Sequence, residues 1–271
     1  MNPWIRITRP VNGIMGIAAT IISAYIGTGS LFLSFYMEIA AACACVFMVT
    51  SGGNVINDIT DVETDRKNHP DRPIPTGMIS LDAARNYSIA LFAIPLALSA
   101  IFLPIDALIV VALAEGVLIS YEFRTKKLGL SGNVSISILV GLIFLFGGIA
   151  VGSFERMLIL FGMASLANLS RELIKEVEDI EGDVDRNTFP KKYGRGMTTV
   201  LAGFSVIAAV SLSALPYLLG IFTWFYLIPV AISDALFLST IGMVSARPAM
   251  GQQVSKLAMI IGLVSFVVGA V

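Results

Sequence analysis

Carboxylate side chains gather in two short segments of a chain that is otherwise strongly apolar. The segments 58–82 and 172–185 hold six and seven carboxylates, which is 13 of the 19 in the protein. Oxygen-bearing side chains step by four residues in both, with Asn57, Asp61 and Asp65 in the first and Asp179 and Asp183, preceded by Lys175, in the second. Such steps place side chains on one face of a helix. Several oxygens brought together in this way suit Mg²⁺, which commonly bridges to substrate phosphates.

The chemistry that this arrangement would support is the departure of a diphosphate. Two or more Mg²⁺ ions held between the segments would bind a diphosphate and neutralise its charge as it leaves, which is Lewis-acid and template catalysis. A single acidic helix face is usually just solvated. Two acidic clusters, each interleaved with basic residues and each at the end of a predicted membrane helix, favour a functional site instead.

The elements that must position these side chains are membrane helices. The chain has 56% hydrophobic residues, 14% charged residues and a mean hydropathy of +0.84, whereas about 25% of the residues of a soluble domain are charged. Uncharged runs are long enough for helices of about 20 residues to cross a bilayer. We therefore predict an all-α, multi-pass membrane bundle that forms one domain over residues 1–271. About nine spans are expected, at roughly 11–29, 38–57, 86–103, 105–121, 132–152, 157–176, 198–216, 222–245 and 255–271.

The basic residues indicate how such a bundle is oriented. Under the nine-helix plan, 17 of the 18 basic residues fall on one side of the membrane and only Arg156 falls on the other. Lys and Arg are enriched on the cytoplasmic side. Both acidic segments and the N-terminus are therefore predicted to be cytoplasmic, with the C-terminus outside the cell membrane. Lipids are expected neighbours, and a nucleic-acid partner is not expected.

A short loop follows the first acidic cluster. Arg72 is followed by Pro73 and Pro75, and two prolines so close together fix the backbone and remove hydrogen-bond donors. We expect a rigid loop that presents Arg72. Ser80 is a favourable N-cap for the helix that comes next.

Both acidic segments belong to longer motifs. The first reads Asn57-Asp58-x-x-Asp61-x-x-x-Asp65-Arg66-x-Asn68-x-Pro70-x-Arg72-Pro73-Ile74-Pro75-x-Gly77, and the second reads Arg171-Glu172-x-x-Lys175-x-x-x-Asp179-x-Glu181-Gly182-Asp183. Around them lie Arg9-Pro10-x-Asn12, Tyr121 with Lys126 and Gly132-Asn133, and Thr188-x-Pro190-x-x-x-Gly194. These motifs span nearly the whole chain and resemble those of the UbiA superfamily of intramembrane prenyltransferases.

The resemblance implies a helical bundle around a central cavity that the acidic segments cap. In that cavity an allylic diphosphate would ionise and an acceptor would be alkylated. By the resemblance, Mg²⁺ would be bound by Asn57, Asp61, Asp65, Asp179 and Asp183, substrate by Asn12, Arg72, Lys126, Arg171 and Lys175, and catalysis would involve Tyr121, Lys126 and Lys175. The chemistry agrees, because an apolar cavity keeps a carbocation from water and cationic side chains stabilise a departing diphosphate. Phe123 stands where many relatives carry a second tyrosine, which leaves the role of Tyr121 open.

The residues of the second motif indicate one branch of the superfamily. It looks most like the archaeal members in which geranylgeranyl diphosphate alkylates the free hydroxyl of geranylgeranylglyceryl phosphate, so a lipid phosphate is the expected acceptor. Arg9, Arg171, Lys191 and Lys192 are candidates for binding its phosphate, and equally for contacts with anionic lipid headgroups. An aromatic prenyltransferase making a quinone or chlorophyll precursor would share the metal sites. A cation transporter is a more remote alternative, since the acids cluster at one face and not along a path between repeats.

Overall fold

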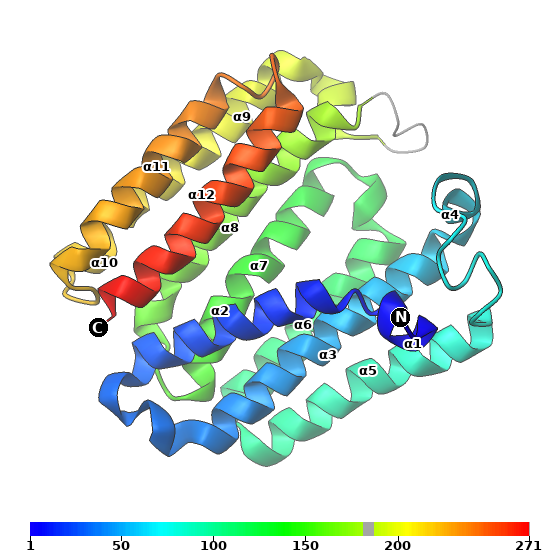
Figure 1. Ribbon diagram of the computed structural model, residues 1–271, viewed down its shortest axis with the longest axis horizontal. Helices are drawn as coiled ribbons and strands as arrows, with labels where there is room; N and C mark the ends of the chain where they lie inside the picture. The colour runs from blue at the N-terminus through cyan, green and yellow to red at the C-terminus, as the bar shows by residue number, and fades with distance from the viewer. Residues whose placement is uncertain (181–186, 271) are drawn as a thin grey trace.

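Helices account for all the regular structure in the part of the chain that the computed structural model describes, residues 1–180 and 187–270 (Figure 1). The predicted all-α class is therefore confirmed. The long helices are α2 (Pro10–Thr28), α3 (Tyr36–Thr60), α5 (Leu81–Phe102), α6 (Ile105–Phe123), α7 (Leu130–Ala150), α8 (Glu155–Glu178), α9 (Phe189–Ser213), α11 (Leu227–Ile241) and α12 (Pro248–Gly269). The short ones are α1 (Pro3–Ile7), η1 (Gly29–Phe35), α4 (Val62–Asn68), η2 (Thr125–Lys127), α10 (Leu215–Leu218) and η3 (Trp224–Tyr226).

The lengths and compositions of these helices indicate a multi-pass membrane protein. Within the described residues, seven helical stretches are long and apolar enough to cross a bilayer: Pro10–Thr60, Leu81–Phe102, Leu130–Ala150, Glu155–Glu178, Phe189–Leu218, Trp224–Ile241 and Pro248–Gly269. The first of them contains both α2 and α3, joined by η1. Helix α6 is not among them, because it carries Asp106, Glu115 and Glu122. The count of nine crossings and the single-domain organisation stay predictions.

Two local predictions about the ends of helices are confirmed. Ser80 is the N-cap of α5, where its hydroxyl accepts a hydrogen bond from the backbone N–H of Ala83 at 3.3 Å. The loop that holds Arg72 contains turns and no helix. Several helix starts differ from the predicted spans: α5 begins at Leu81 and not near 86, α12 begins at Pro248 and not near 255, and α9 begins at Phe189 and not near 198. The first turn of α9, which contains Lys191 and Lys192, is separated from the rest by Gly194, whose φ of 81° interrupts the helical backbone.

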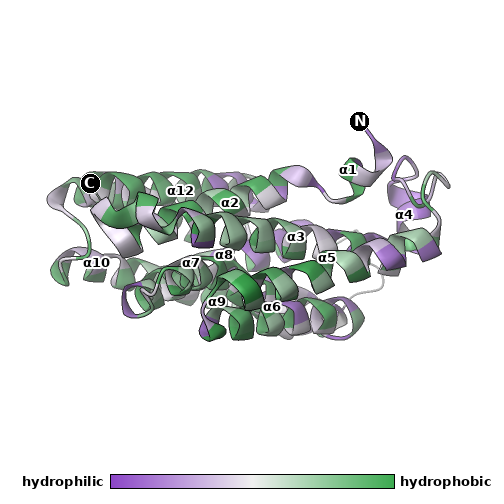
Figure 2. Ribbon diagram, turned by 90° about the horizontal axis from the view of Figure 1, so that it is seen from below, coloured by the Kyte–Doolittle hydropathy of each residue, from purple (hydrophilic) through white to green (hydrophobic). Residues whose placement is uncertain are grey.

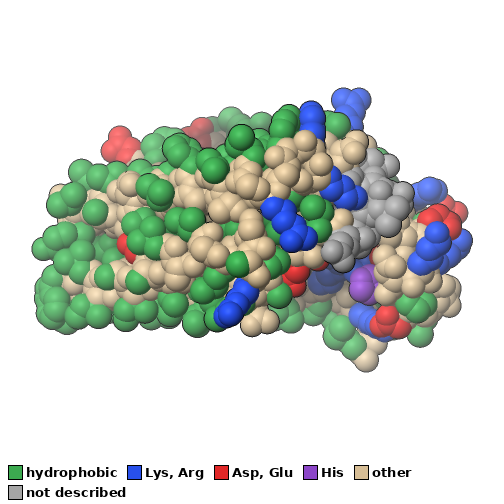
Figure 3. All heavy atoms as spheres, turned by 90° about the horizontal axis from the view of Figure 1, so that it is seen from above, with side chains coloured by type: hydrophobic (Ala, Val, Ile, Leu, Met, Phe, Trp, Pro, Cys, Tyr) green, Lys and Arg blue, Asp and Glu red, His purple; other side chains and the backbone are tan. Residues whose placement is uncertain are grey.

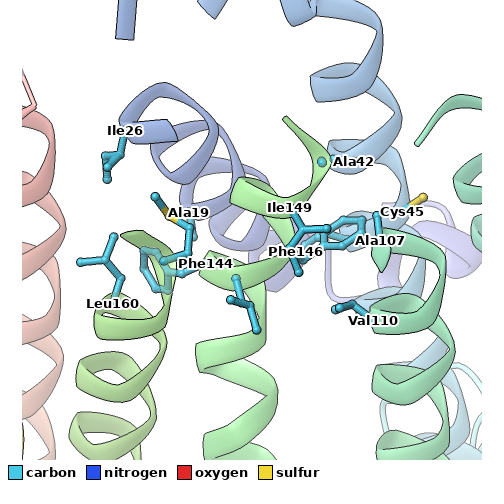
Figure 4. Close-up of a cluster of buried hydrophobic side chains, with 14 of the residues drawn as sticks. Ala19, Ile26, Ala42, Cys45, Ala107, Val110, Phe144, Phe146, Ile149 and Leu160 are labelled. Carbon is cyan, nitrogen blue, oxygen red and sulfur yellow. The ribbon is translucent and has the colours of Figure 1, made fainter. Parts of the chain in front are cut away.

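Apolar side chains hold the long helices together. Helix α2 packs against α3 and α7, and α8 packs against α7, α9 and α12. The close-up in Figure 4 shows part of the core, to which α2 contributes Ala19 and Ile26, α7 contributes Phe144 and Ile149, and α8 contributes Leu160. In a membrane, burying such side chains gives little hydrophobic gain, because lipid tails are as apolar as the core itself. Close packing of these side chains is what stabilises the helix pairs.

The polar parts of the chain lie at one end of the bundle. The N-terminus, α1 and α4 lie at that end, and the C-terminus lies at the other (Figure 1). Colouring by hydropathy shows hydrophilic residues at the same end and mostly hydrophobic helices elsewhere (Figure 2). On the face drawn in Figure 3, Lys and Arg side chains also gather toward that end. The N-terminus and the C-terminus therefore lie at opposite ends of the helical bundle (Figure 1).

We expect cysteine labelling to identify the cytoplasmic end. Thr76, Asn187 and Glu155 are exposed, so each can be changed to cysteine in a chain in which Cys43 and Cys45 are replaced by alanine. In inverted membrane vesicles a membrane-impermeant maleimide should label Thr76→Cys and Asn187→Cys but not Glu155→Cys, because the positive-inside bias places the first two in the cytoplasm. Labelling of Thr76→Cys and Asn187→Cys from opposite sides would contradict a shared site.

Candidate active site

One pocket brings the second acidic motif together with Tyr121 and Lys126. Its volume is about 40 Å³ and it lies where the connection from α6 to α7 meets the end of α8. Tyr121, Lys126, Lys175 and Asp179 all line it, and the rest of its lining comes from Gly129, Gly132, Asn133, Glu172 and Glu176. Four of the residues that sequence analysis selected therefore face one small polar space.

The first acidic motif keeps its helical stepping although the helix is interrupted. Helix α3 ends at Thr60, and Asp61 is at once the C-cap of α3 and the N-cap of α4. The backbone N–H of Asp61 donates to the carbonyl of Asn57 at 2.9 Å, and that of Asp65 donates to the carbonyl of Asp61 at 2.8 Å. Asn57, Asp61 and Asp65 therefore follow one another along one side, as the spacing predicts.

Lys126 connects this motif to the pocket. Its ammonium donates to Asp61 Oδ2 at 2.5 Å and to Glu122 Oε2 at 2.9 Å, and its side chain is only 6% exposed. A lysine so deeply buried needs anionic partners. Because Lys126 also lines the pocket, Asp61 lies one side chain away from the space that Lys175 and Asp179 border.

Glu122 is a residue of the site that sequence analysis missed. Its side chain is 5% exposed. Both of its oxygens accept from the amide of Asn57 at 3.1 Å, and one also accepts from the hydroxyl of Thr60 at 3.2 Å and from Lys126. Glu122 thus ties α6 to the first acidic motif and fixes the side-chain orientation of Asn57. The spacing of four residues between Glu122 and Lys126 is a signal that could have revealed it.

Arg72 is held against the same motif from the other side. Its guanidinium lies 2.5 Å from Asp65 Oδ2 and 3.4 Å from Asp58 Oδ1. The buried Asp58 is also paired with Arg9, whose guanidinium donates to Asn57 Oδ1 at 3.2 Å. Of the non-glycine residues described, Arg9 alone has a positive φ, 49°. This backbone conformation is costly and persists where the surroundings demand it, here in a second polar pocket of about 200 Å³ that Arg9, Arg72 and Asp58 help to line.

Besides Asn57, Asp61, Asp65 and Arg72, two described residues selected from the sequence do not line the first pocket, Arg171 and Asn12. Arg171 pairs with Glu172 at 2.7 Å and contacts Asn168 Oδ1 at 3.4 Å, but it is not among the residues that line either pocket. Asn12 is exposed in the first turn of α2 and also lies outside both linings. Asp183 lies outside the residues that the structure describes.

The donor set has the chemistry that Mg²⁺ requires. Asn57, Asp61, Asp65 and Asp179 offer only carboxylate or amide oxygens, and hard cations prefer oxygen ligands. Over residues 1–180 and 187–270, no group of three His, Cys, Asp or Glu side chains is clustered as for a metal ion. Asp61 and Asp65 are instead paired with Lys126 and Arg72. Each of these two candidate metal ligands is therefore in contact with a cationic side chain that could bind a diphosphate.

Comparison with known proteins gives a consistent result. The model of the UbiA prenyltransferase family matches residues 15–261. A digeranylgeranylglyceryl phosphate synthase from Methanosphaera stadtmanae is 38% identical over 277 residues, which covers 100% of both chains. The protein of the same name from Methanothermobacter thermautotrophicus is 40% identical over 241 residues, which is 88% of this chain and 83% of that one.

Solved structures share the fold. A structure described as digeranylgeranylglyceryl phosphate synthase matches with a TM-score of 0.88 and 36% identity, covering 99% of this chain and 97% of that one. A UbiA homologue from Archaeoglobus fulgidus bound to GPP and Mg²⁺ matches with a TM-score of 0.67 and 17% identity over 98% of this chain and 100% of that one. The second likeness concerns the fold alone.

Proposed function

The chain belongs to the UbiA prenyltransferase family, and on that premise we propose that it transfers the geranylgeranyl group of geranylgeranyl diphosphate to geranylgeranylglyceryl phosphate. The product would be digeranylgeranylglyceryl phosphate, the diether precursor of archaeal membrane lipids. Relatives that carry the name of this synthase and match the chain over its full length support the choice of substrates. A prenyltransferase of this kind works inside the membrane, where both prenyl chains are soluble.

The observation that carries the proposal is the pocket in which the second acidic motif meets Tyr121 and Lys126. Tyr121 and Lys126 reach it from α6 and η2, while Lys175 and Asp179 reach it from the end of α8. The two ammonium groups can stabilise a departing diphosphate, the aromatic ring can stabilise an allylic cation, and the carboxylate can bind Mg²⁺. The bundle is hydrophilic at one end and mostly hydrophobic elsewhere (Figure 2), which suits a substrate with a charged head and a long hydrocarbon tail.

The reaction breaks the bond between C1 of the geranylgeranyl group and its diphosphate oxygen. The diphosphate leaves with the electron pair, the acceptor hydroxyl oxygen forms the new ether bond to C1, and the hydroxyl proton passes to the diphosphate or to water. Lys126, Lys175 and Arg72 stabilise the negative charge that develops on the leaving group. The ring of Tyr121 offers its electron-rich face to the allylic cation. The surrounding apolar helices exclude water, which would otherwise capture the cation.

The acidic side chains have a separate task in this proposal. Asn57, Asp61, Asp65, Asp179 and Asp183 would hold Mg²⁺. When bound, Mg²⁺ supplies Lewis-acid stabilisation of the diphosphate oxygens. Glu122 orients the amide of Asn57 and keeps the ammonium of Lys126 in place. The oxygen of Asn57 and the ammonium of Lys126 are therefore positioned before substrate binds.

The decisive experiment is an assay with defined substrates. Purified protein in detergent or nanodiscs is incubated with radiolabelled geranylgeranyl diphosphate, Mg²⁺ and either geranylgeranylglyceryl phosphate or 4-hydroxybenzoate. We expect a labelled diether phosphate with the lipid phosphate alone, and no product when EDTA replaces Mg²⁺. Product with 4-hydroxybenzoate and none with the lipid phosphate would instead identify an aromatic prenyltransferase, and product at full rate in EDTA would contradict the metal site.

A further inference from the structure

The first pocket contains a buried hydrogen-bond donor to which the proposed mechanism gives no role. Asn133, in the first turn of α7, is 7% exposed, and its side-chain Nδ2 has no hydrogen-bond partner among the described residues. Asn133 is also one of the residues that line this pocket. A buried amide without a partner destabilises the fold, so its presence calls for a ligand that would satisfy it.

The N-terminus of α7 borders the same pocket. This helix spans 21 residues, and its N-cap, Gly129, provides no side-chain hydrogen bond. Gly129 and Gly132 both line the pocket beside Asn133. The first backbone N–H groups of a long helix and the positive end of its dipole attract anions. The helix end and the amide of Asn133 are therefore two independent features that favour an anion here.

Two glycines allow the backbone to close around this space. A Cβ on Gly132 would lie 2.9 Å from the carbonyl oxygen of Thr125 and 3.4 Å from Cα of Lys126. A Cβ on Gly129, whose φ is +59°, would lie 2.7 Å from the carbonyl oxygen of Asn187. Glycine at both positions lets α7 begin in contact with η2 and with the start of α9, and so keeps Asn133 close to Lys126.

The charges in the pocket agree with this reading. Lys126 and Lys175 provide two cations in the lining. Three carboxylates line the pocket as well: Asp179 is one of the proposed Mg²⁺ ligands, Glu172 accepts from Arg171 at 2.7 Å, and Glu176 accepts from the backbone N–H of Phe189 at 3.1 Å. Glu172 and Glu176 therefore have donors of their own within the protein, and neither depends on Asn133.

We propose that the side-chain amide of Asn133 donates a hydrogen bond to a phosphate oxygen of the prenyl diphosphate, next to the N-terminus of α7. The inference rests on the proposed function, because it places a substrate phosphate in this pocket. The prenyl diphosphate is the source we assign, since Lys126 and Lys175 border the same space. Asn133 is then a substrate-binding residue that neither acidic motif contains.

The test compares ligand binding with stability in Asn133→Leu, which keeps the approximate size of the side chain and removes both donors. The ligands are geranylgeranyl thiodiphosphate, an unreactive analogue, and geranylgeranylglyceryl phosphate, each with Mg²⁺ present. We expect the Kd of the thiodiphosphate to rise about tenfold or more, as for loss of a hydrogen bond to a charged group. The Kd of the acceptor should stay unchanged. The Tm should stay equal or rise, since an unsatisfied buried amide is removed.

Control variants make the result unambiguous. Ser131→Ala changes an exposed residue of the same helical turn and should bind both ligands as the unchanged protein does. Asn133→Asp keeps the shape of the side chain but replaces donors by acceptors, so it should weaken diphosphate binding even if Asn133→Leu folds poorly. Unchanged diphosphate affinity in both Asn133 variants would overturn the proposal, as would a loss confined to the acceptor. Failure of the proposed function is seen separately, as absence of product from the unchanged protein.

Discussion

Asp61→Ala should lower kcat/KM by about a thousandfold or more, the largest effect that we expect from a single substitution. Asp61 is both a proposed Mg²⁺ ligand and the carboxylate 2.5 Å from Lys126. Stabilisation of transition-state charge by a bound metal is worth several kcal/mol, and a loss of about 4 kcal/mol corresponds to about three powers of ten in rate. The measurement is the initial rate of transfer from geranylgeranyl diphosphate over a range of Mg²⁺ concentrations.

A matched variant separates this effect from a general loss of negative charge. Asp82→Ala removes a carboxylate that is 88% exposed and paired only with its helical neighbour Arg85 in the described part of the chain, so it should keep nearly full activity. Asp61→Ala itself should remain folded, because Glu122 still pairs with Lys126. Near-normal turnover of Asp61→Ala at saturating Mg²⁺ would show that the two acidic segments do not form the metal site.

Lys126→Met should reduce kcat/KM for the prenyl diphosphate by roughly ten- to a hundredfold. A hydrogen bond to a charged group is worth about 1.5 to 3 kcal/mol, and each 1.36 kcal/mol is about tenfold in rate. The substitution also leaves Glu122 buried without its ammonium partner. Breaking a buried ion pair from one side destabilises a protein by roughly 3 to 5 kcal/mol, so the Tm should fall as well.

The double variant Lys126→Met with Glu122→Gln distinguishes the two roles of the lysine. Neutralising Glu122 removes the unpaired buried charge, so the Tm should recover much of its loss while kcat/KM stays low. KM for the acceptor should change less than KM for the diphosphate in both variants. If Lys126→Met weakened the acceptor and spared the diphosphate, Lys126 would belong to the acceptor phosphate. Recovery of activity together with stability would mean that Lys126 matters only for folding.

The sequence predicted those features that depend on short-range patterns. Long uncharged runs predicted helices, because a helix satisfies all the backbone hydrogen bonds of a segment of about 20 apolar residues inside a bilayer. Prolines at 73 and 75 predicted the loop that carries Arg72, and Ser80 predicted the start of α5, since both effects act within a few residues. The steps of four among Asn57, Asp61 and Asp65 likewise required only local helical geometry, and they persist across the break between α3 and α4. The same reasoning set the start of α9 too late, because Lys191, Lys192 and Gly194 separate Phe189 and Pro190 from the long apolar run that follows.

By itself, then, the sequence determined the helical membrane class, the two acidic motifs and the identity of most of their side chains. Only the tertiary structure decided which of those side chains meet. Arg171 and Lys175 lie on the same helix, yet Lys175 lines the pocket and Arg171 does not. Glu122 and Asn133 belong to neither acidic motif, and they reach the site because α6 packs on α3 and α7 begins against η2. The physical reason is that partners of a buried charge or amide come from other helices, and helix packing depends on side-chain shapes along whole interfaces that no local pattern records.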